Sequence, residues 1–482
     1  MAIKRFYAEK DNTITNAYKP NLTTRATSSN MGAADILEVF SIYGQASQDS
    51  AELARILIQF PMLDVKNAVD AGEIPADAKY YLRLFNAVHQ ETLPDNYNLT
   101  VCKLTKAWTE GSGLDMNDYG DVGVSNWVSA STGNAWDNDG NPLVATPGAF
   151  GNTSTTIESD TFTEGTENLE VDVTSIVSSW LLNTALNYGF LVKLATAYES
   201  ATRSYYVKKF FGRGSEFFFK RPVIEARWND SKKDNRGNFV ISSSMLTAND
   251  NLNKLYLYNV YKGQYKDVQG LTGDKLFVSL YRGSLTDASP TSFTASKVET
   301  GIYTASVYLN TTASTIYDVW STGSSQGVND GARATQFYTG SITPISHAAL
   351  DKNPSDSYIV NITNLKKSYE ASEKARFRVY ARNLNWSPTV YTVASTNIQA
   401  SQIENLYYRI SREVDDLVII DFGTGSVKYS LTSYDKNGNY FDLDMNLLEA
   451  NYSYVISFLV EENGNRKQIK NTFRFRVEES NE

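Results

Sequence analysis

The sequence predicts an all-β protein, and three features of the 482-residue chain support this prediction. Apolar and polar residues alternate in many short segments, such as residues 35–41 and 375–381, and this period of two is typical of strands with one buried face. Aromatic residues, which favour strands, are abundant, with 31 Tyr, 22 Phe and 7 Trp. Asn, Ser, Thr and Gly are frequent, as expected where many turns connect short strands.

Composition and charge argue against several classes of protein. No segment approaches the ~18 apolar residues of a membrane-spanning helix, so we predict no membrane span. The N-terminus is basic but lacks the apolar segment of a secretory signal peptide, so we expect no export by that route. The net charge of −9 argues against general binding to nucleic acid. The single cysteine, Cys102, excludes an intramolecular disulfide and is predicted to be a small buried apolar residue.

Residues 1–230 are predicted to form the first domain. Residues 1–30 are polar and rich in Asn and Thr, which predicts an extended N-terminal arm. After this arm, strands are expected at residues 35–41, 51–60, 78–88 and 97–106, and a short helical segment at residues 65–72.

The stretch from Glu170 to Trp228 is predicted to close this domain. Residues 170–173 alternate like a half-buried strand, and Thr174 or Ser175 is expected to cap the short helix that follows, because a hydroxyl can accept backbone N–H groups of a first turn. A turn at residues 188–189 leads into a strand from residue 190, and residues 223–226 form the last strand. The apolar residues of the helix are expected to plug one end of the core: Ile176, Val177, Trp180 and Leu181.

A long loop, residues 109–150 with Trp108 at its start, interrupts the strand pattern; we call it the Trp loop. Loops of this length within a domain are usually functional or poorly ordered. Trp108, Trp127 and Trp136 are candidates for stacking on sugar rings, and the alternatives are anchoring of the loop or burial against a neighbouring subunit. Asp137 and Asp139 alternate with Asn around a Gly turn, as ligands do in a calcium loop, but no distal Glu completes the site, and a plain turn is the alternative.

Six short passages, in order, resemble a DNRLRE-type domain, a jelly-roll β-sandwich related to carbohydrate-binding modules. The resemblance covers roughly residues 30–230 and implies a jelly roll there; by analogy with such modules it also implies a structural calcium ion. The passages are ILEVFSIY with ELARILIQFPM (36–43 and 52–62), IPADAKYYLRLF (74–85), KLTKAWTEGSGLD (103–115), SNWV (125–128), LEVDVTSIVSSWL with NYGFLVKL (169–181 and 187–194), and KRPVIEARW (220–228).

The second half of the chain predicts two smaller modules after a polar linker at residues 232–238. Strands separated by turn signals suggest immunoglobulin-like β-sandwiches at residues 240–345 and 356–482. Within them, residues 435–439 predict a hairpin turn between two apolar segments. The predicted fold class is therefore all-β: a jelly-roll β-sandwich followed by two immunoglobulin-like β-sandwiches.

Few residues suit catalysis. The two histidines, His89 and His347, fall in different predicted domains, and both are expected to be structural. A zinc site built from Cys or several His is therefore not expected. Glycosidases use a pair of carboxylates, and the acids of the Trp loop are candidates for such a pair only because they share a loop with Trp. These acids are Asp115, Asp118, Asp121, Asp137 and Asp139.

The Phe-rich stretch, residues 208–220, is the most unusual segment. It places five Phe among basic residues, which is too apolar for a free loop. We expect one face to be buried in the sandwich and the other to contact another chain. The contact candidates are Phe210, Phe211, Phe217 and Phe218.

Taken together, these features predict a non-enzymatic structural component of a bacteriophage virion, made in the host cytoplasm and located in the tail, neck, baseplate or head surface. Its partners would be other virion proteins, with several copies in a symmetric assembly, and no cofactor is expected apart from the structural calcium ion. Two alternatives remain: an adhesion module that binds a host cell-surface polysaccharide, and a hydrolase that cleaves one.

Overall fold

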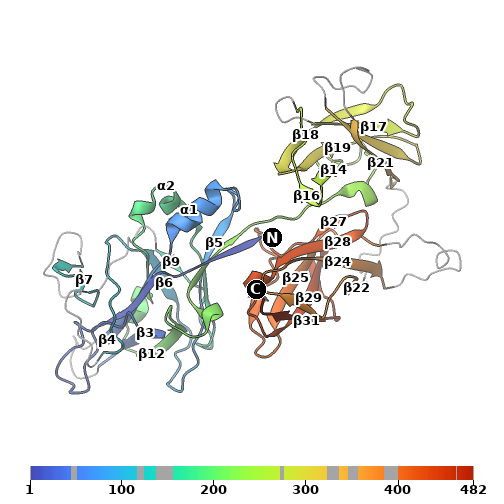
Figure 1. Ribbon diagram of the computed structural model, residues 1–482. Helices are drawn as coiled ribbons and strands as arrows, with labels where there is room; N and C mark the ends of the chain where they lie inside the picture. Colours follow the sequence, from blue (N-terminus) through green and yellow to red (C-terminus); the bar gives the residue numbers. More distant parts are fainter. Residues whose placement is uncertain are drawn as a thin grey trace. The chain divides into compact units, whose positions relative to one another are not determined.

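The computed structural model describes residues 2–44, 52–116, 124–136, 156–271, 276–322, 336–345, 357–384, 400–462 and 464–480. These residues form mostly antiparallel β-sheets with a few short helices, which confirms the all-β prediction (Figure 1). The chain divides into two compact units, residues 2–229 and residues 230–482. Within the described ranges, no helix is both long enough and apolar enough to cross a bilayer.

The described residues of the 2–229 unit form two large sheets and one two-stranded sheet. The four-stranded sheet has the order β1 (Ile3–Tyr7), β13 (Val223–Arg227), β5 (Lys79–Leu84) and β10 (Leu169–Asp172). The seven-stranded sheet has the order β12 (Tyr205–Phe211), β3 (Ile36–Ile42), β4 (Glu52–Gln59), β11 (Phe190–Leu194), β6 (Leu99–Lys103) and β9 (Ile157–Glu158), with β2 (Lys10–Thr15) paired to β4. One apolar core takes side chains from both sheets, so the unit is a β-sandwich.

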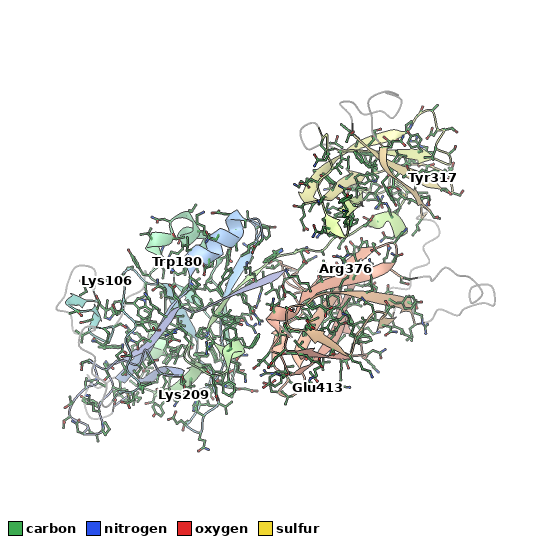
Figure 2. The ribbon with its side chains drawn as sticks, viewed as in Figure 1. Lys106, Trp180, Lys209, Tyr317, Arg376 and Glu413 are labelled. Carbon is green, nitrogen blue, oxygen red and sulfur yellow. The ribbon has the colours of Figure 1, made fainter. Side chains whose placement is uncertain are left out.

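Two helices close one end of this core, whereas the sequence predicts this role only for the second of them. They are α1 (Met62–Asp70) and α2 (Thr174–Leu182), which pack against each other (Figure 1). Trp180 of α2, labelled in Figure 2, is fully buried. Its ring meets that of Phe190 of β11 edge-on at 4.8 Å. A third helix, α3 (Thr196–Glu199), is a single turn. The turn before β11 depends on Gly189, because its φ is +91° and a Cβ there would lie 2.3 Å from the carbonyl oxygen of Ile58.

The structure corrects two local predictions. Residues 1–30 are not a free arm: β1 pairs with β13, so the start and end of the unit are neighbouring strands, and β2 pairs with β4. The start of α2 is not capped by a hydroxyl. Asp172 accepts hydrogen bonds from the backbone N–H and the hydroxyl of Thr174 instead, because Thr174 is already inside the helix.

The first half of the 230–482 unit is a set of strands around its own core. Its main sheet has the order β14 (Asn253–Tyr258), β19 (Ile302–Val307), β18 (Thr291–Glu299), β17 (Leu276–Arg282), β20 (Ile316–Ser321) and β21 (Gln336–Ile342). Strand β18 pairs with β17 along its first half and with β19 along its second. A short hairpin, β15 (Val260–Tyr261) and β16 (Gln264–Tyr265), follows β14.

The second half of this unit has two sheets. One has the order β22 (Tyr358–Ile362), β24 (Lys374–Asn383), β28 (Gly438–Asp444) and β27 (Ser433–Asp435). The other has the order β23 (Ser368–Glu370), β31 (Phe473–Glu478), β29 (Ser453–Glu462), β25 (Leu406–Arg412) and β26 (Val418–Ile420), with β30 (Asn465–Gln468) paired to β29. Aromatic rings join the sheets: Tyr408 of β25 stacks on Phe441 of β28 at 4.2 Å. The predicted hairpin is confirmed, since Asp435 pairs with Gly438.

The segment predicted as a polar linker is ordered and partly buried. Within the 230–482 unit, Lys232 and Asp234 exchange backbone hydrogen bonds with Tyr434 in β27. Arg236 donates to Asp234 and to Asp318 of β20, and Asp318 has no exposed surface. Burial raises the pKa of Asp234 to about 6, against the opposing effect of the Arg236 charge. The segment therefore connects strands of both halves of the unit instead of forming a solvated tether.

A buried lysine joins three segments of the 2–229 unit. The Lys208 ammonium in β12 donates to Asn86 Oδ1 at 2.6 Å and to the carbonyl oxygens of Gly165 and Glu167, each at 2.8 Å. It also lies 5.0 Å from the ring of Phe210. Burial lowers the pKa of Lys208 to about 7, yet all three acceptors are satisfied at once only by the ammonium form.

We expect Lys208→Met to lower the free energy of unfolding of this unit by about 3 kcal/mol, because one buried and two partly buried oxygen acceptors lose their donor. Urea unfolding followed by tryptophan fluorescence would measure the change. Lys79→Met, at an exposed position on β5, is the matched control and should unfold like the wild type. Equal stability of both variants would contradict this role for Lys208.

Candidate functional site

The described parts of the Trp loop, residues 108–116 and 124–136, pack through their indoles on the outer face of the seven-stranded sheet. Trp108, Trp127 and Trp136 are 4%, 2% and 6% exposed and form a second apolar core with residues of the sheet. Cys102 belongs to this core, as predicted. The loop contributes a small hairpin, β7 (Ser129–Ser131) and β8 (Asn134–Ala135). In this arrangement the three indoles anchor the loop, which was the structural alternative, and offer no open ring face for a sugar or a subunit.

Polar contacts hold the indoles in place. Trp108 Nε1 donates to the carbonyl oxygen of Tyr188 at 2.9 Å, and Trp136 Nε1 donates to that of Asn126 at 2.8 Å. The Arg55 guanidinium lies 5.0 Å from the Trp127 ring and donates to both carboxylate oxygens of Glu199, at 2.9 and 3.0 Å. Arg55 thus links the Trp loop to α3. This double contact is a structural role for the arginine that begins the RILIQF passage.

A buried polar cluster fastens the start of the Trp loop to the N-terminal strands. Asn30 uses its whole amide: Nδ2 donates to the carbonyl oxygens of Glu110 and Ser125, and Oδ1 accepts from the N–H groups of Gly32 and Gly113. This contact explains why polar residues of the N-terminal segment are buried.

Asp11 and Glu110 form the charged part of this cluster. Arg213 donates from its side chain to both Glu110 carboxylate oxygens and from its backbone N–H to Asp11. Asp11 is 1% exposed, and burial raises its pKa to about 7 in spite of the hydrogen bond from Arg213. The cluster therefore holds one carboxyl group that changes its charge near neutral pH.

The Phe-rich stretch is divided between the core and the surface. Phe210 is fully buried in the main core, so it cannot be a contact residue in this arrangement. Phe217 and Phe218 are 49% and 44% exposed, and Phe211 is half-buried. We call the last three the Phe cluster.

Rings and cations alternate in the Phe cluster. Phe211 and Phe217 meet edge-on at 5.5 Å, and the Lys220 ammonium lies 5.5 Å from the Phe211 ring. Phe218 lies 4.4 Å from Tyr7 of β1, and the Arg221 guanidinium lies 5.2 Å from the Phe218 ring. The cluster is thus an exposed aromatic surface with basic groups among its rings.

An ion-pair layer lies on the outer face of the four-stranded sheet. Glu225 of β13 is 1% exposed and receives hydrogen bonds from Arg5 at 2.8 Å, Arg83 at 2.8 Å and Arg227 at 2.6 Å. Burial alone would raise the pKa of Glu225, but the three guanidinium groups hold it well below its usual range. Arg227 also pairs with Glu170 of β10. In the sequence, Glu225 and Arg227 alternate with Ile224 and Ala226. This alternation was the signal that the outer face of the four-stranded sheet carries charged residues.

Most of the predicted metal and carboxylate positions, and one of the two histidines, fall outside the part of the chain that the structure describes. Asp137, Asp139, Asp118, Asp121 and His347 lie outside the described residues. Asp115 is exposed, and His89 Nδ1 accepts a hydrogen bond from the backbone of Glu91. In the part of the chain that the structure describes, no group of three or more His, Cys, Asp or Glu is placed to hold a metal ion.

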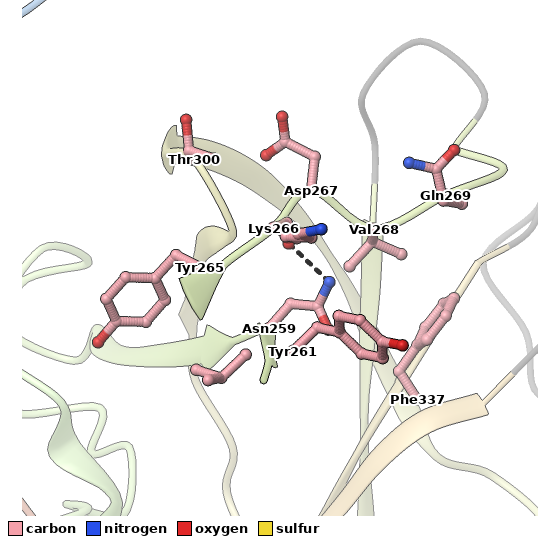
Figure 3. Close-up of a pocket in the computed structure, with 10 residues that line it drawn as sticks. Asn259, Tyr261, Tyr265, Lys266, Asp267, Val268, Gln269, Thr300 and Phe337 are labelled. Atoms are coloured by element: carbon pink, nitrogen blue, oxygen red, sulfur yellow. Dashed lines mark hydrogen bonds between the residues drawn. The ribbon is translucent and has the colours of Figure 1, made fainter. Parts of the chain in front are cut away.

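Sequence reasoning missed an open hollow beside the β15–β16 hairpin (Figure 3). It has a volume of ≈590 Å³ and is lined in part by Tyr261, Tyr265 and Phe337. The signal was the passage Tyr-Lys-Gly-Gln-Tyr, because a Lys-Gly turn between two tyrosines predicts a hairpin that projects them.

Comparisons with known proteins identify no family. No protein-family model and no curated protein sequence matches the chain. Among solved structures, a marsupial T cell receptor aligns with 43% of this chain and 65% of its own length, at 10% identity and a TM-score of 0.17. The Yersinia pseudotuberculosis adhesin InvE aligns with 44% of this chain and 50% of its own length, at 13% identity and a TM-score of 0.15. A DUF4785 family protein from Legionella pneumophila covers 99% of this chain and aligns over 90% of its own, at 9% identity and a TM-score of 0.15.

The chain thus spans less than two thirds of the receptor and of the adhesin. TM-scores this low carry no argument about fold or function.

Asp11→Asn should change how stability depends on pH. Because the folded carboxyl keeps its proton to about pH 7 while the unfolded one releases it near 3.8, Asp11 makes the wild type less stable as pH rises from about 4 to 7. We expect the melting temperature of Asp11→Asn, relative to wild type, to increase over this range. Asp77→Asn, at an exposed position, should show no such trend. A constant difference for Asp11→Asn would contradict the shifted pKa.

Glu225→Gln should destabilise the 2–229 unit by about 3–5 kcal/mol, because three buried guanidinium groups lose their shared carboxylate. Urea unfolding of the full chain, followed by tryptophan fluorescence, would measure this loss. Glu216→Gln, at an exposed position of the Phe-rich stretch, is the control. If both variants unfold at the same urea concentration, the ion-pair layer does not hold the sheet together.

Proposed function

We propose that this chain is a non-enzymatic structural component of a bacteriophage virion, in the tail, neck, baseplate or head surface, and that it acts through contacts between subunits. The observation that carries the proposal is the Phe cluster. Phe217 and Phe218, each almost half exposed, lie at the start of a short 3-10 helix (Phe218–Lys220), and Lys220 and Arg221 lie near rings of the cluster. Aromatic and Arg side chains on a fixed support are the usual energetic centre of a protein interface.

The architecture supports the same role. β-sandwiches offer broad sheet faces and loop ends for assembly contacts, and we further propose that residues 2–229 are a jelly roll and that the two later modules are immunoglobulin-like. The three indoles of the Trp loop are packed into a core with the seven-stranded sheet. Assembly through buried area requires no catalytic group, and permanent interfaces of this kind bury roughly 2,000 Å² or more.

The first test is mass spectrometry of purified phage particles, with the copy number measured against the major capsid protein. We expect a constant count of a few to a few dozen copies per particle. Absence from particles, with the protein free in the lysate or on cells, would overturn the proposal.

The second test asks whether the Phe cluster is the surface that contacts other virion proteins. We expect the double variant Phe217→Ser with Phe218→Ser to be incorporated about tenfold less into particles, because an interface loses its aromatic anchors. Tyr43→Ser removes an aromatic side chain that is also exposed, at 38%, from another part of the same unit and should be incorporated normally. Normal incorporation of the double variant, with its fold intact, would show that the Phe cluster is not the contact.

A further inference from the structure

The hollow beside the β15–β16 hairpin gathers exposed aromatic side chains on one small surface. Tyr261, Tyr265 and Phe337 are 56%, 41% and 41% exposed. Tyr261 and Tyr265 leave opposite faces of the hairpin, because Val260 pairs with Tyr265 and Tyr261 pairs with Gln264. Figure 3 shows Tyr261 on the same side as Phe337 and Val268, with Tyr265 on the other side of the hairpin. Of the three rings that line the hollow, those of Tyr261 and Phe337 therefore lie on the same side.

The hairpin that carries Tyr261 is well defined for a surface element. Lys262 and Gly263 have φ values of 50° and 78°, the positive pair that a tight two-residue turn of this kind needs. Asn259 Nδ2 donates to the carbonyl oxygen of Lys266 at 2.6 Å, and the Asn259 backbone N–H donates to that of Gly301 (Figure 3). The Tyr261 ring is thus presented by a braced ribbon, which lowers the entropy cost of binding.

The charge available at the hollow is positive. The ammonium groups of Lys262 and Lys266 lie 5.5 and 5.3 Å from the Tyr261 ring. The Asp267 carboxylate also lines the hollow, but its charge is balanced by a neighbouring lysine. It accepts hydrogen bonds from Lys297 at 2.7 Å and from the Gly301 N–H at 2.8 Å. A ligand that places an anionic group beside a ring stacked on Tyr261 would complement this arrangement.

The rim supplies neutral polar groups as well. Gln269 and Thr300 line the hollow, and both side chains are exposed. An amide and a hydroxyl of this kind can exchange hydrogen bonds with the hydroxyls of a sugar. The volume of ≈590 Å³ lies within the range of small-ligand sites.

From this geometry we propose that the hollow binds an acidic glycan, with the C–H face of a hexuronic acid unit against Tyr261 and Phe337 and its carboxylate beside Lys262 and Lys266. The two rings provide apolar area for the sugar face, and the two ammonium groups provide the counter-charge. The proposal moves glycan recognition from the buried Trp loop to the first half of the 230–482 unit. It does not depend on the proposed structural role.

The test measures binding of the full chain to polygalacturonate by isothermal titration calorimetry at low and at high salt. Neutral dextran and a single-stranded oligonucleotide of matched charge are the comparison probes. We expect binding to polygalacturonate that weakens as salt rises, and much weaker binding to dextran and to the oligonucleotide.

Variants locate the site. Tyr261→Ala, Phe337→Ala and the double variant Lys262→Gln with Lys266→Gln should each weaken binding about tenfold. Tyr308→Ala is the aromatic control, since Tyr308 is 54% exposed in the same half of the unit and does not line this hollow. Lys254→Gln, at an exposed position on β14, is the charge control. Circular dichroism confirms that each variant is folded.

Several results would overturn the proposal. No binding to polygalacturonate by the folded wild type would exclude the uronate ligand. Equal binding to dextran or to the oligonucleotide would show that the carboxylated sugar is not what the hollow recognises. Unchanged binding in the Tyr261 and Phe337 variants would place the site elsewhere. Incorporation of the Tyr261 and Phe337 variants into particles distinguishes failure of the glycan proposal from failure of the structural role. These variants leave the Phe cluster intact, so they should be incorporated normally whether or not the hollow binds a glycan.

Discussion

The organisation of the 2–229 unit depends on burial of both faces of its seven-stranded sheet. One face packs on the main core with the four-stranded sheet, and the other lies under the Trp loop. A sheet that is apolar on both sides needs a second cover, and the long loop provides it with three indoles. Because the backbone groups of a buried loop must still find partners, Asn30 and Asn126 accept and donate hydrogen bonds beneath it.

The same constraint explains why charged residues are buried in this unit. Arg55, Lys208 and Glu225 are each less than a tenth exposed, and each has partners that match its charge or its donors. Each also joins segments distant in the sequence: Arg55 reaches Glu199, Lys208 reaches Asn86, and Glu225 receives Arg5. Such groups are costly if a partner is lost, so they make one arrangement of strands and loops much more favourable than others.

The two surfaces that we propose for partners differ in chemistry. The Phe cluster is exposed and aromatic and suits a protein partner that buries it. The hollow at Tyr261 and Phe337 is open, has two lysine ammonium groups near the Tyr261 ring, and suits a ligand with a flat apolar face and a negative group. A structural protein that also holds a glycan would use the first surface for assembly and the second for recognition, in separate units of the chain.

The sequence by itself determined the class of fold and most of the strands. Alternation of apolar and polar residues located β3, β4, β10 and β24 closely, and the apolar spacing after Thr174 located α2. These features are local, since a strand or a helix turn shows its period within a few residues. Cys102 was also predictable, because its apolar neighbours alternate with polar ones.

Only the tertiary structure decided what covers each face. Trp127 was a candidate for sugar stacking, with anchoring of the loop as an alternative, and Phe210 was a contact candidate, yet both are buried. Alternation shows that a side chain leaves one face of a strand and not what packs on that face. The polar residues 1–15 became two strands because partners about 40 and 220 positions away pair with them. Tyr261 and Phe337 meet at one hollow although more than 70 residues separate them. Contacts over such separations depend on how the whole chain packs, which local sequence patterns do not encode.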